Sequence, residues 1–275
     1  MLKKLVHYLN NHGLLKTFKK LIAKFVISIG LVEDIPKTRI RLCNHLYKTL
    51  DGKIKYGPMK GLSLNLDNMQ WSKHDIGSIL LGLYELEVLK ELQYLSSKHS
   101  TFCDIGAADG IFGVGVLSAN LYNKSICFEI DDIGRSNIFK LAKQNNVENK
   151  IEIYEEASVK TMASLDHISW KDACILIDIE GEEFNFINDE FLQVVNGASL
   201  IIEIHDKYQN NPSEAKEKLI NTLKKKYEIK TITTSNRDLS HIEELDEFHD
   251  NEKWLLCSEG RGWRMDWWVC EPILK

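Results

Sequence analysis

The chain has 275 residues, of which 44% are hydrophobic, and its formal net charge at pH 7 is −5. This length and apolar content suit one α/β domain with additions. The acidic balance argues against an enzyme that acts on nucleic acid, because such enzymes usually carry a basic face. The six cysteines include no C-x-x-C pair, which argues against a disulfide scaffold or a zinc site and favours a reduced, cytoplasmic protein.

Residues 1–60 predict a basic, amphipathic helical extension. Its lysines at positions 16, 20 and 24 follow one side, and Lys24 interrupts the apolar run before it reaches the length of a membrane span. Two interpretations stay open: the helix packs on the rest of the protein or on a second subunit, or it lies on an anionic membrane at the inner face. The apolar residues that recur at helical spacing are Leu14, Leu15, Phe18, Leu21, Ile22, Phe25, Val26 and Ile29.

Residues 101–117, TFCDIGAADGIFGVGVL, predict a buried strand, a glycine-rich turn and the start of a helix at 111–121. The turn from Gly106 to Gly110 has little side-chain bulk, so a ligand can approach its backbone closely. The first amides of the helix face the turn and can hold an anionic group. The pattern therefore indicates a site for a nucleotide-like cofactor.

The remaining chain alternates strands and helices, which indicates an α/β fold with a mostly parallel, Rossmann-like sheet covered by helices on both faces. Ligands of such sheets bind beyond the carboxyl ends of the strands. That rule places Asp104, Glu129, Asp178 and His205 along one edge. The predicted strands after the first are 125–130, 151–154, 173–177, 199–205, 228–234 and 265–270, and the predicted helices are 132–144, 183–195 and 213–225.

The glycine spacing separates two cofactor classes. The motif typical of a dinucleotide-binding site is G-x-G-x-x-G. The glycines here are instead at 106, 110 and 113, with Asp104 before them. This arrangement resembles motif I of class I S-adenosylmethionine-dependent methyltransferases. Glu129 closes the next predicted strand, and its two carboxylate oxygens suit a pair of vicinal ribose hydroxyls. A nicotinamide-dependent oxidoreductase is disfavoured by the same spacing.

Three further motifs extend the resemblance to the FkbM subfamily of these methyltransferases. The subfamily pattern is roughly G-x-Y-E, D-I-G-A-x-x-G, D-x-E-G-x-E and I-E-x-H, and the resemblance covers about residues 64–205. The chain has GLYE at 82–85, DIEGEE at 178–183 and IEIH at 202–205. Residues 61–275 are accordingly expected to form the methyltransferase domain.

The resemblance implies S-adenosylmethionine as cofactor and a hydroxyl as methyl acceptor, most often on a sugar of a glycan, glycolipid or secondary metabolite. An inactive methyltransferase-like partner subunit is the alternative. We expect a small-molecule or glycan acceptor, no nucleic-acid partner, and leave a homo-oligomer open. The cofactor residues implied by position are Glu85, Asp104, Gly106, Ala107, Gly110, Glu129, Ile130, Ala157, Ser158 and Asp178.

A sugar hydroxyl is too weak an acid to ionise at neutral pH, so a general base or a metal ion should remove its proton. His205 is the first choice of base, because its ordinary pKa lies near neutrality. Asp178 and Glu180 follow a predicted strand and can project into the same cleft. Asp178, Glu203 and His205 could instead bind Mg²⁺ or Mn²⁺. We expect no bound metal from the sequence.

Overall fold

The computed structural model describes residues 16–26, 34–262 and 264–273, and its core is a seven-stranded sheet. The strand order is β3-β2-β1-β4-β5-β7-β6, and β7 runs antiparallel to both of its neighbours. This is the class I methyltransferase variant of the Rossmann-like sheet, so the expected fold class is confirmed. The strands are β1 (Thr101–Ile105), β2 (Lys124–Phe128), β3 (Ile151–Tyr154), β4 (Ala173–Ile177), β5 (Ser199–Glu203), β6 (Tyr227–Thr233) and β7 (Asp266–Pro272).

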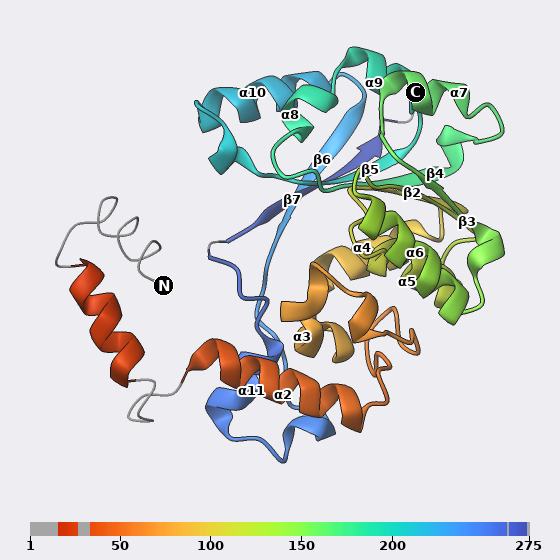
Figure 1. Cartoon of the computed structure of the whole chain (residues 1–275). Coiled ribbons are helices and arrows are strands. Elements are labelled where there is room, and N and C mark those ends of the chain that lie inside the picture. The colour runs from red at the N-terminus through yellow and green to blue at the C-terminus, as the bar shows by residue number, and fades with distance from the viewer. Residues whose placement is uncertain (1–15, 27–33, 263, 274–275) are drawn as a thin grey trace.

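Helices cover both faces of the sheet. Figure 1 shows α7 to α10 on one side and α4 to α6 on the other, with α2, α3 and α11 grouped near the far ends of β6 and β7. The helices are α2 (Ile35–Thr49), α3 (Ile76–Leu80), α4 (Leu86–Leu95), α5 (Ile111–Ser118), α6 (Asp132–Gln144), α7 (Val159–Ser164), α8 (Glu183–Phe186), α9 (Asp189–Val194), α10 (Pro212–Leu223) and α11 (Asp250–Cys257).

The helix expected over 183–195 is two helices, α8 and α9. Asn188 has an extended backbone between them, and its side chain accepts a hydrogen bond from the backbone N–H of Phe191. The extended backbone of Ile187 and Asn188 ends α8, and the Asn188 side chain then caps α9 by satisfying one of its first N–H groups.

The central strands bury both faces, which explains why they read as continuous apolar runs. Phe102 and Leu176 belong to the hydrophobic cluster beneath α4 to α6, whereas Cys103 and Ile175 belong to the cluster beneath α7 to α10. All six cysteines are buried and none forms a disulfide.

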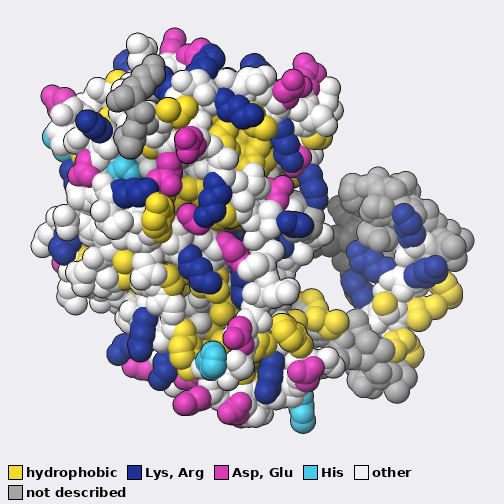
Figure 2. All heavy atoms as spheres, turned by 180° about the vertical axis from the view of Figure 1, so that it is seen from behind, with side chains coloured by type: hydrophobic (Ala, Val, Ile, Leu, Met, Phe, Trp, Pro, Cys, Tyr) yellow, Lys and Arg dark blue, Asp and Glu magenta, His cyan; other side chains and the backbone are white. Residues whose placement is uncertain are grey.

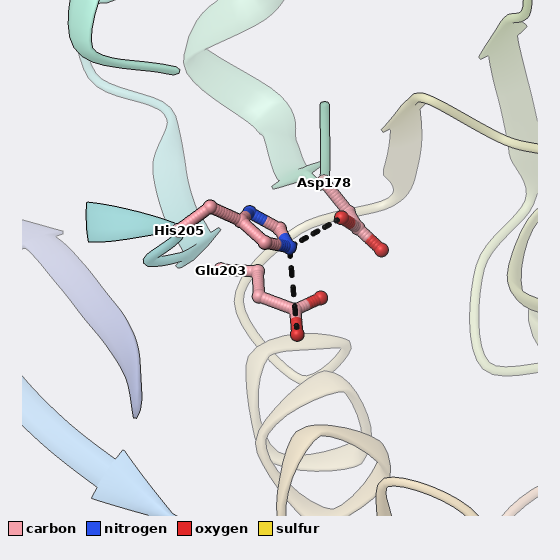
Figure 3. A group of neighbouring side chains, drawn as sticks. All are labelled: Asp178, Glu203 and His205. Atoms are coloured by element: carbon pink, nitrogen blue, oxygen red, sulfur yellow. Dashed lines mark ion pairs between the residues drawn. The ribbon is translucent and has the colours of Figure 1, made fainter. Parts of the chain in front are cut away.

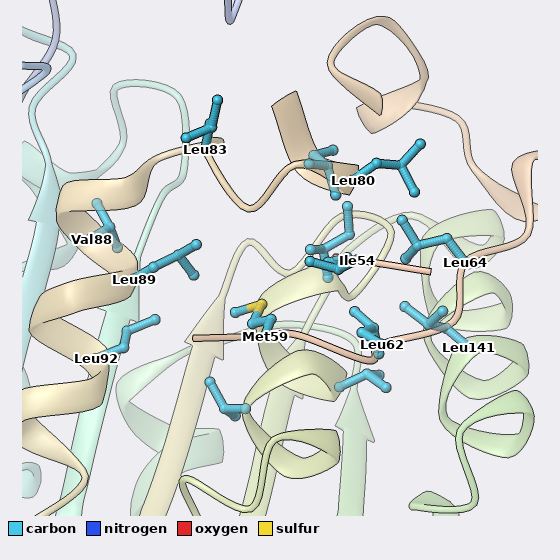
Figure 4. Packing of buried hydrophobic residues seen from close by; sticks show 14 of the residues in the cluster. Ile54, Met59, Leu62, Leu64, Leu80, Leu83, Val88, Leu89, Leu92 and Leu141 are labelled. Carbon is cyan, nitrogen blue, oxygen red and sulfur yellow. The ribbon is translucent and has the colours of Figure 1, made fainter. Parts of the chain in front are cut away.

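The segment before α4 completes the first of these clusters. Figure 4 shows Ile54, Met59 and Leu62 packed with side chains of α4 and α6. Met59 lies so close to α5 that a Cβ on Gly115 would be 2.4 Å from its sulfur. Residues that precede position 60 are thus part of the core that carries the site.

Residues 16–26 form a helix that lies apart from the sheet domain in Figure 1. Phe18, Leu21, Ile22 and Phe25 are exposed on it, and hydrophobic side chains are visible on this segment in Figure 2. Leu14, Leu15 and Ile29, expected on the same apolar stripe, lie outside the described residues. Among the helices of residues 16–26, 34–262 and 264–273, none has the length and hydropathy needed to cross a membrane.

Candidate active site

The glycine-rich turn after β1 is held against the ends of β2 and β4. The backbone N–H groups of Gly106 and Ala107 both donate to the carbonyl of Phe128 at 3.0 Å. Gly106 has φ of +91°, and a Cβ there would lie 1.8 Å from the carbonyl oxygen of Asp178. Gly110 begins α5 with φ of +81°, and a Cβ on it would meet Ile138. Both positions therefore require glycine.

Two carboxylates organise this turn and the start of α5 through hydrogen bonds from backbone N–H groups. Asp104 is buried beneath it and accepts from the N–H of Gly113 at 3.1 Å. Burial, and the nearby Asp178 carboxylate, raise the pKa of Asp104 to about 8. Glu129 accepts from the N–H groups of Ala108 at 2.7 Å and Asp131 at 2.8 Å. The oxygens of Glu129 still have acceptor capacity, since each carboxylate oxygen carries two lone pairs.

Asp109 fixes a distant segment over the site. Its carboxylate accepts from the backbone N–H groups of Gln70, Trp71 and Ser72 at 2.9 to 3.1 Å, and from the side-chain amide of Asn137 at 3.1 Å. Trp71 is thereby held at the wall of the cavity described next. Neither Asp109 nor Trp71 was expected at the site from the sequence.

A cavity of about 630 Å³ opens over the carboxyl ends of β1, β2 and β4. The cofactor residues expected from the sequence that line it are Gly106, Glu129, Ile130, Ala157 and Asp178. Its other walls include Trp71, Asp75, Tyr84, Ala108, Glu155, Glu156, Ile179 and Phe186.

The remaining expected cofactor residues are placed elsewhere. Asp104, Ala107 and Gly110 lie within or beneath the turn, and Ser158 caps α7 by accepting from the N–H of Thr161. Glu85 lines a second, smaller cavity. Glu85 differs from the others in that its Oε2 is buried without a hydrogen-bond partner.

The second cavity has a volume of about 240 Å³ and adjoins the first. Tyr84, Asp178 and Glu180 line both cavities. The smaller cavity is also lined by Glu85, Glu203, His205, Tyr208, Arg261, Gly262 and Met265. A group bound in one cavity would therefore meet a group bound in the other at these three shared side chains.

Arg261 lines the smaller cavity and pairs with its acidic side chains. It donates to Glu203 Oε1 at 2.8 Å, to Glu259 Oε2 at 2.7 Å, and to Glu85 Oε1. Burial and repulsion from neighbouring carboxylates raise the pKa of Glu85 to about 8 and that of Glu203 to about 11, although Arg261 opposes both shifts. Arg261 was not expected at the site, because no local pattern reveals that Arg261 and Gly262 return to the ends of β4 and β5.

Asp178, Glu203 and His205 meet where β4 and β5 end, as Figure 3 shows. The His205 Nε2 atom lies 3.7 Å from Asp178 Oδ1, 3.6 Å from Glu180 Oε2 and 3.9 Å from Glu203 Oε1. The three expected catalytic residues, His205, Asp178 and Glu180, are thus brought together, with Glu203 beside them.

The imidazole of His205 is held on its other edge. Glu183 accepts from the backbone N–H of His205 at 2.7 Å, and the same oxygen lies 3.5 Å from the ring Nδ1. The ring of Tyr208 stacks on the imidazole with an interplanar angle of 7°. Burial lowers the pKa of His205, but Glu183, Asp178 and Glu180 outweigh it and raise the pKa above its ordinary value.

Comparison with known proteins adds structures of similar fold. An O-methyltransferase from Bacillus cereus in complex with SAH is 10% identical, with a TM-score of 0.47 and coverage of 91% of this chain and 97% of that one. An rRNA methylase from Streptococcus thermophilus is 12% identical, with a TM-score of 0.45 and coverage of 68% and 96%. The M1A22 tRNA methyltransferase of B. subtilis is 10% identical, with a TM-score of 0.42 and coverage of 66% and 64%.

No family model and no curated protein matches the sequence. The FkbM resemblance therefore rests on the four motifs alone. The expectation of no nucleic-acid partner is corrected, because the similar structures include enzymes named for tRNA and rRNA. Net charge was too coarse a criterion, since it averages the whole surface and does not describe one face.

Proposed function

We propose that this protein is an S-adenosylmethionine-dependent methyltransferase that acts on a hydroxyl group. The observation that carries the proposal is the pair of adjoining cavities, which share Tyr84, Asp178 and Glu180. The larger cavity has a size typical of a cofactor site. An acceptor in the smaller one would then face the methyl donor across these shared residues.

The residues of the larger cavity fit the proposed cofactor. The turn at Gly106 and Ala108 leaves backbone open to the ligand, and Glu129 has lone pairs for the ribose hydroxyls. Ile130 and Ala157 offer apolar surface for the adenine. Glu85 Oε2 is buried without a partner and suits the methionine ammonium group. When bound, the cofactor would supply a sulfonium methyl group, the electrophile of the reaction.

On the acceptor side, the hydroxyl is expected to bind at Asp178, Glu180 and His205. Its oxygen forms the new bond to the methyl carbon as the carbon–sulfur bond breaks, and its proton passes to this group of side chains. Asp178 lines both cavities and would orient the acceptor. His205 is held by Glu183 and Tyr208, so its Nε2 keeps a fixed direction toward the acceptor.

A sugar is the acceptor that we propose, in line with the FkbM-like motifs. The smaller cavity combines carboxylates, which accept hydrogen bonds from several hydroxyls, with the rings of Tyr84 and Tyr208, which offer apolar faces. An anionic acceptor would be disfavoured by the carboxylates of Asp178 and Glu180.

The test is methyl transfer from radiolabelled S-adenosylmethionine to a panel of neutral sugars, sugar phosphates and RNA. Transfer to a neutral sugar by the wild type, and its loss in His205→Ala with unchanged cofactor affinity, would support the proposal. Cofactor binding without transfer to any member would favour an inactive subunit, and transfer to RNA alone would contradict the sugar assignment.

A further inference from the structure

His205 presents an unshared ring nitrogen to a group of carboxylates. Its side chain is only 6% exposed, and its Nδ1 faces Glu183 at 3.5 Å. A neutral ring with its proton on Nδ1 directs the Nε2 lone pair at Asp178, Glu180 and Glu203. Buried lone pairs that face one another repel unless a proton or a metal cation lies between them.

The distances from Nε2 suit a shared ion better than hydrogen bonds. They are 3.6 to 3.9 Å, longer than the range of up to about 3.2 Å for a hydrogen bond. Ligands bound to one small divalent ion at about 2.1 Å lie roughly 3 Å apart when the bonds are at right angles. The ligand atoms of Asp178, Glu203 and His205 all lie within 4.8 Å of one another, so a shift of side chains would close them on an ion.

The smaller cavity is also rich in acidic side chains. Four of them, Glu85, Asp178, Glu180 and Glu203, line it together with Arg261. Asp178 Oδ1 is buried without a hydrogen-bond partner. Arg261 donates a hydrogen bond to Glu203 Oε1, so Glu203 Oε2 is the oxygen that would bind the ion.

The geometry points to a divalent cation held by Asp178, Glu203 and His205, between the ends of β4 and β5. Two carboxylates and an imidazole suit Mn²⁺ or Mg²⁺, with water or the acceptor oxygen completing the shell. This inference departs from the sequence-based expectation of no metal, and its catalytic meaning rests on the proposed function. The ion would lower the pKa of a bound hydroxyl. Glu180, which is 76% exposed at its side chain, is then the group that receives the proton.

The test is titration of the full chain, stripped with a chelator and then dialysed, with MnCl₂, followed by the electron paramagnetic resonance of free Mn²⁺. We expect one tight site per chain, and a loss of affinity of at least tenfold in both Asp178→Asn and His205→Gln. Glu190→Gln, on the exposed surface of α9, is the control and should bind as the wild type does. Thermal unfolding without metal shows whether each variant is folded.

Wild-type protein that binds no Mn²⁺, or folded variants that bind it equally well, would overturn the inference. Titration with S-adenosylhomocysteine is run in parallel and reports on the proposed function alone. Mn²⁺ binding without cofactor binding would retain the metal site and reject the methyltransferase, and the converse would reject only the metal site.

Discussion

The carbonyl oxygen of Asp178 occupies the place that a side chain at Gly106 would need, with 1.8 Å between it and an added Cβ. This contact joins the turn after β1 to the start of the loop after β4. The cofactor turn and the expected catalytic carboxylate are consequently positioned by one backbone contact.

Gly106→Ala should therefore disrupt the site well beyond the effect of an unfavourable φ. A positive φ alone costs about 1–2 kcal/mol for a residue with a Cβ, and here Asp178 must move as well. We expect loss of S-adenosylhomocysteine binding by calorimetry and a lower unfolding temperature. Gly61→Ala is the matched control, because Gly61 has φ of +95° and nothing within 4 Å of an added Cβ. Equal effects of the two substitutions would contradict the account.

Arg261→Met should strongly destabilise the fold. It would leave Glu85 and Glu203 without the guanidinium that now binds them, whereas Glu259 would keep its hydrogen bond from Arg237. Removing one partner of a buried ion pair costs about 3–5 kcal/mol, because the other charge stays buried. Denaturant unfolding measures the change, with Arg264→Met, at an exposed arginine, as the control. A loss below 1 kcal/mol would show that the acids are stabilised in another way.

The apo protein should lose stability as the pH rises from 5 to 9. Glu85 and Asp104 have folded pKa values of about 8, raised above their ordinary values of 4.5 and 3.8. Between these values the folded state binds more protons than the unfolded state, so the free energy of unfolding falls with increasing pH. His205, whose folded pKa is raised, acts in the same direction over its own range.

Unfolding temperatures across this pH range provide the measurement. Glu85→Gln should flatten the decline, because the substituted amide cannot ionise. Glu228→Gln, on an exposed position of β6, should leave the decline unchanged. Stability that rises toward pH 9 in the wild type would contradict the raised pKa values.

Asp109→Ala should weaken cofactor binding without touching the cofactor cavity directly. The substitution removes the acceptor for three consecutive backbone N–H groups and so releases Trp71 from the cavity wall. We expect at least a tenfold loss of S-adenosylhomocysteine affinity and a smaller change in tryptophan fluorescence on binding. Asp67→Ala, an exposed acid of the same segment, is the control. Unchanged affinity would show that the position of Trp71 does not contribute to cofactor binding.

The sequence predicted the strands and the acids at their ends because both follow from local patterns. A buried parallel strand is a short apolar run, and parallel strands bring their carboxyl ends to one edge. Asp178 and His205 could thus be placed together although 27 residues separate them in the sequence. The same rule placed Glu129 beside the glycine turn.

Residues delivered by loops could not be predicted in this way. Trp71 and Arg261 reach the site from segments without periodicity, and only the folded chain shows that Asp109 and Glu85 hold them there. Glu183 belongs to the DIEGEE motif at 178–183. Its hydrogen bond from the backbone N–H of His205 could not be predicted, because this bond depends on the short loop after β5. The burial that raises the pKa values of Glu85 and Glu203 is likewise a property of the whole fold.

Calorimetric titration of the wild type with S-adenosylmethionine, S-adenosylhomocysteine and NAD in parallel shows whether the larger cavity binds an adenosyl cofactor. We expect micromolar binding of the two adenosyl compounds, no binding of NAD, and at least tenfold weaker adenosyl binding in Glu129→Gln. Binding of NAD alone, or of none of the three, would contradict this expectation.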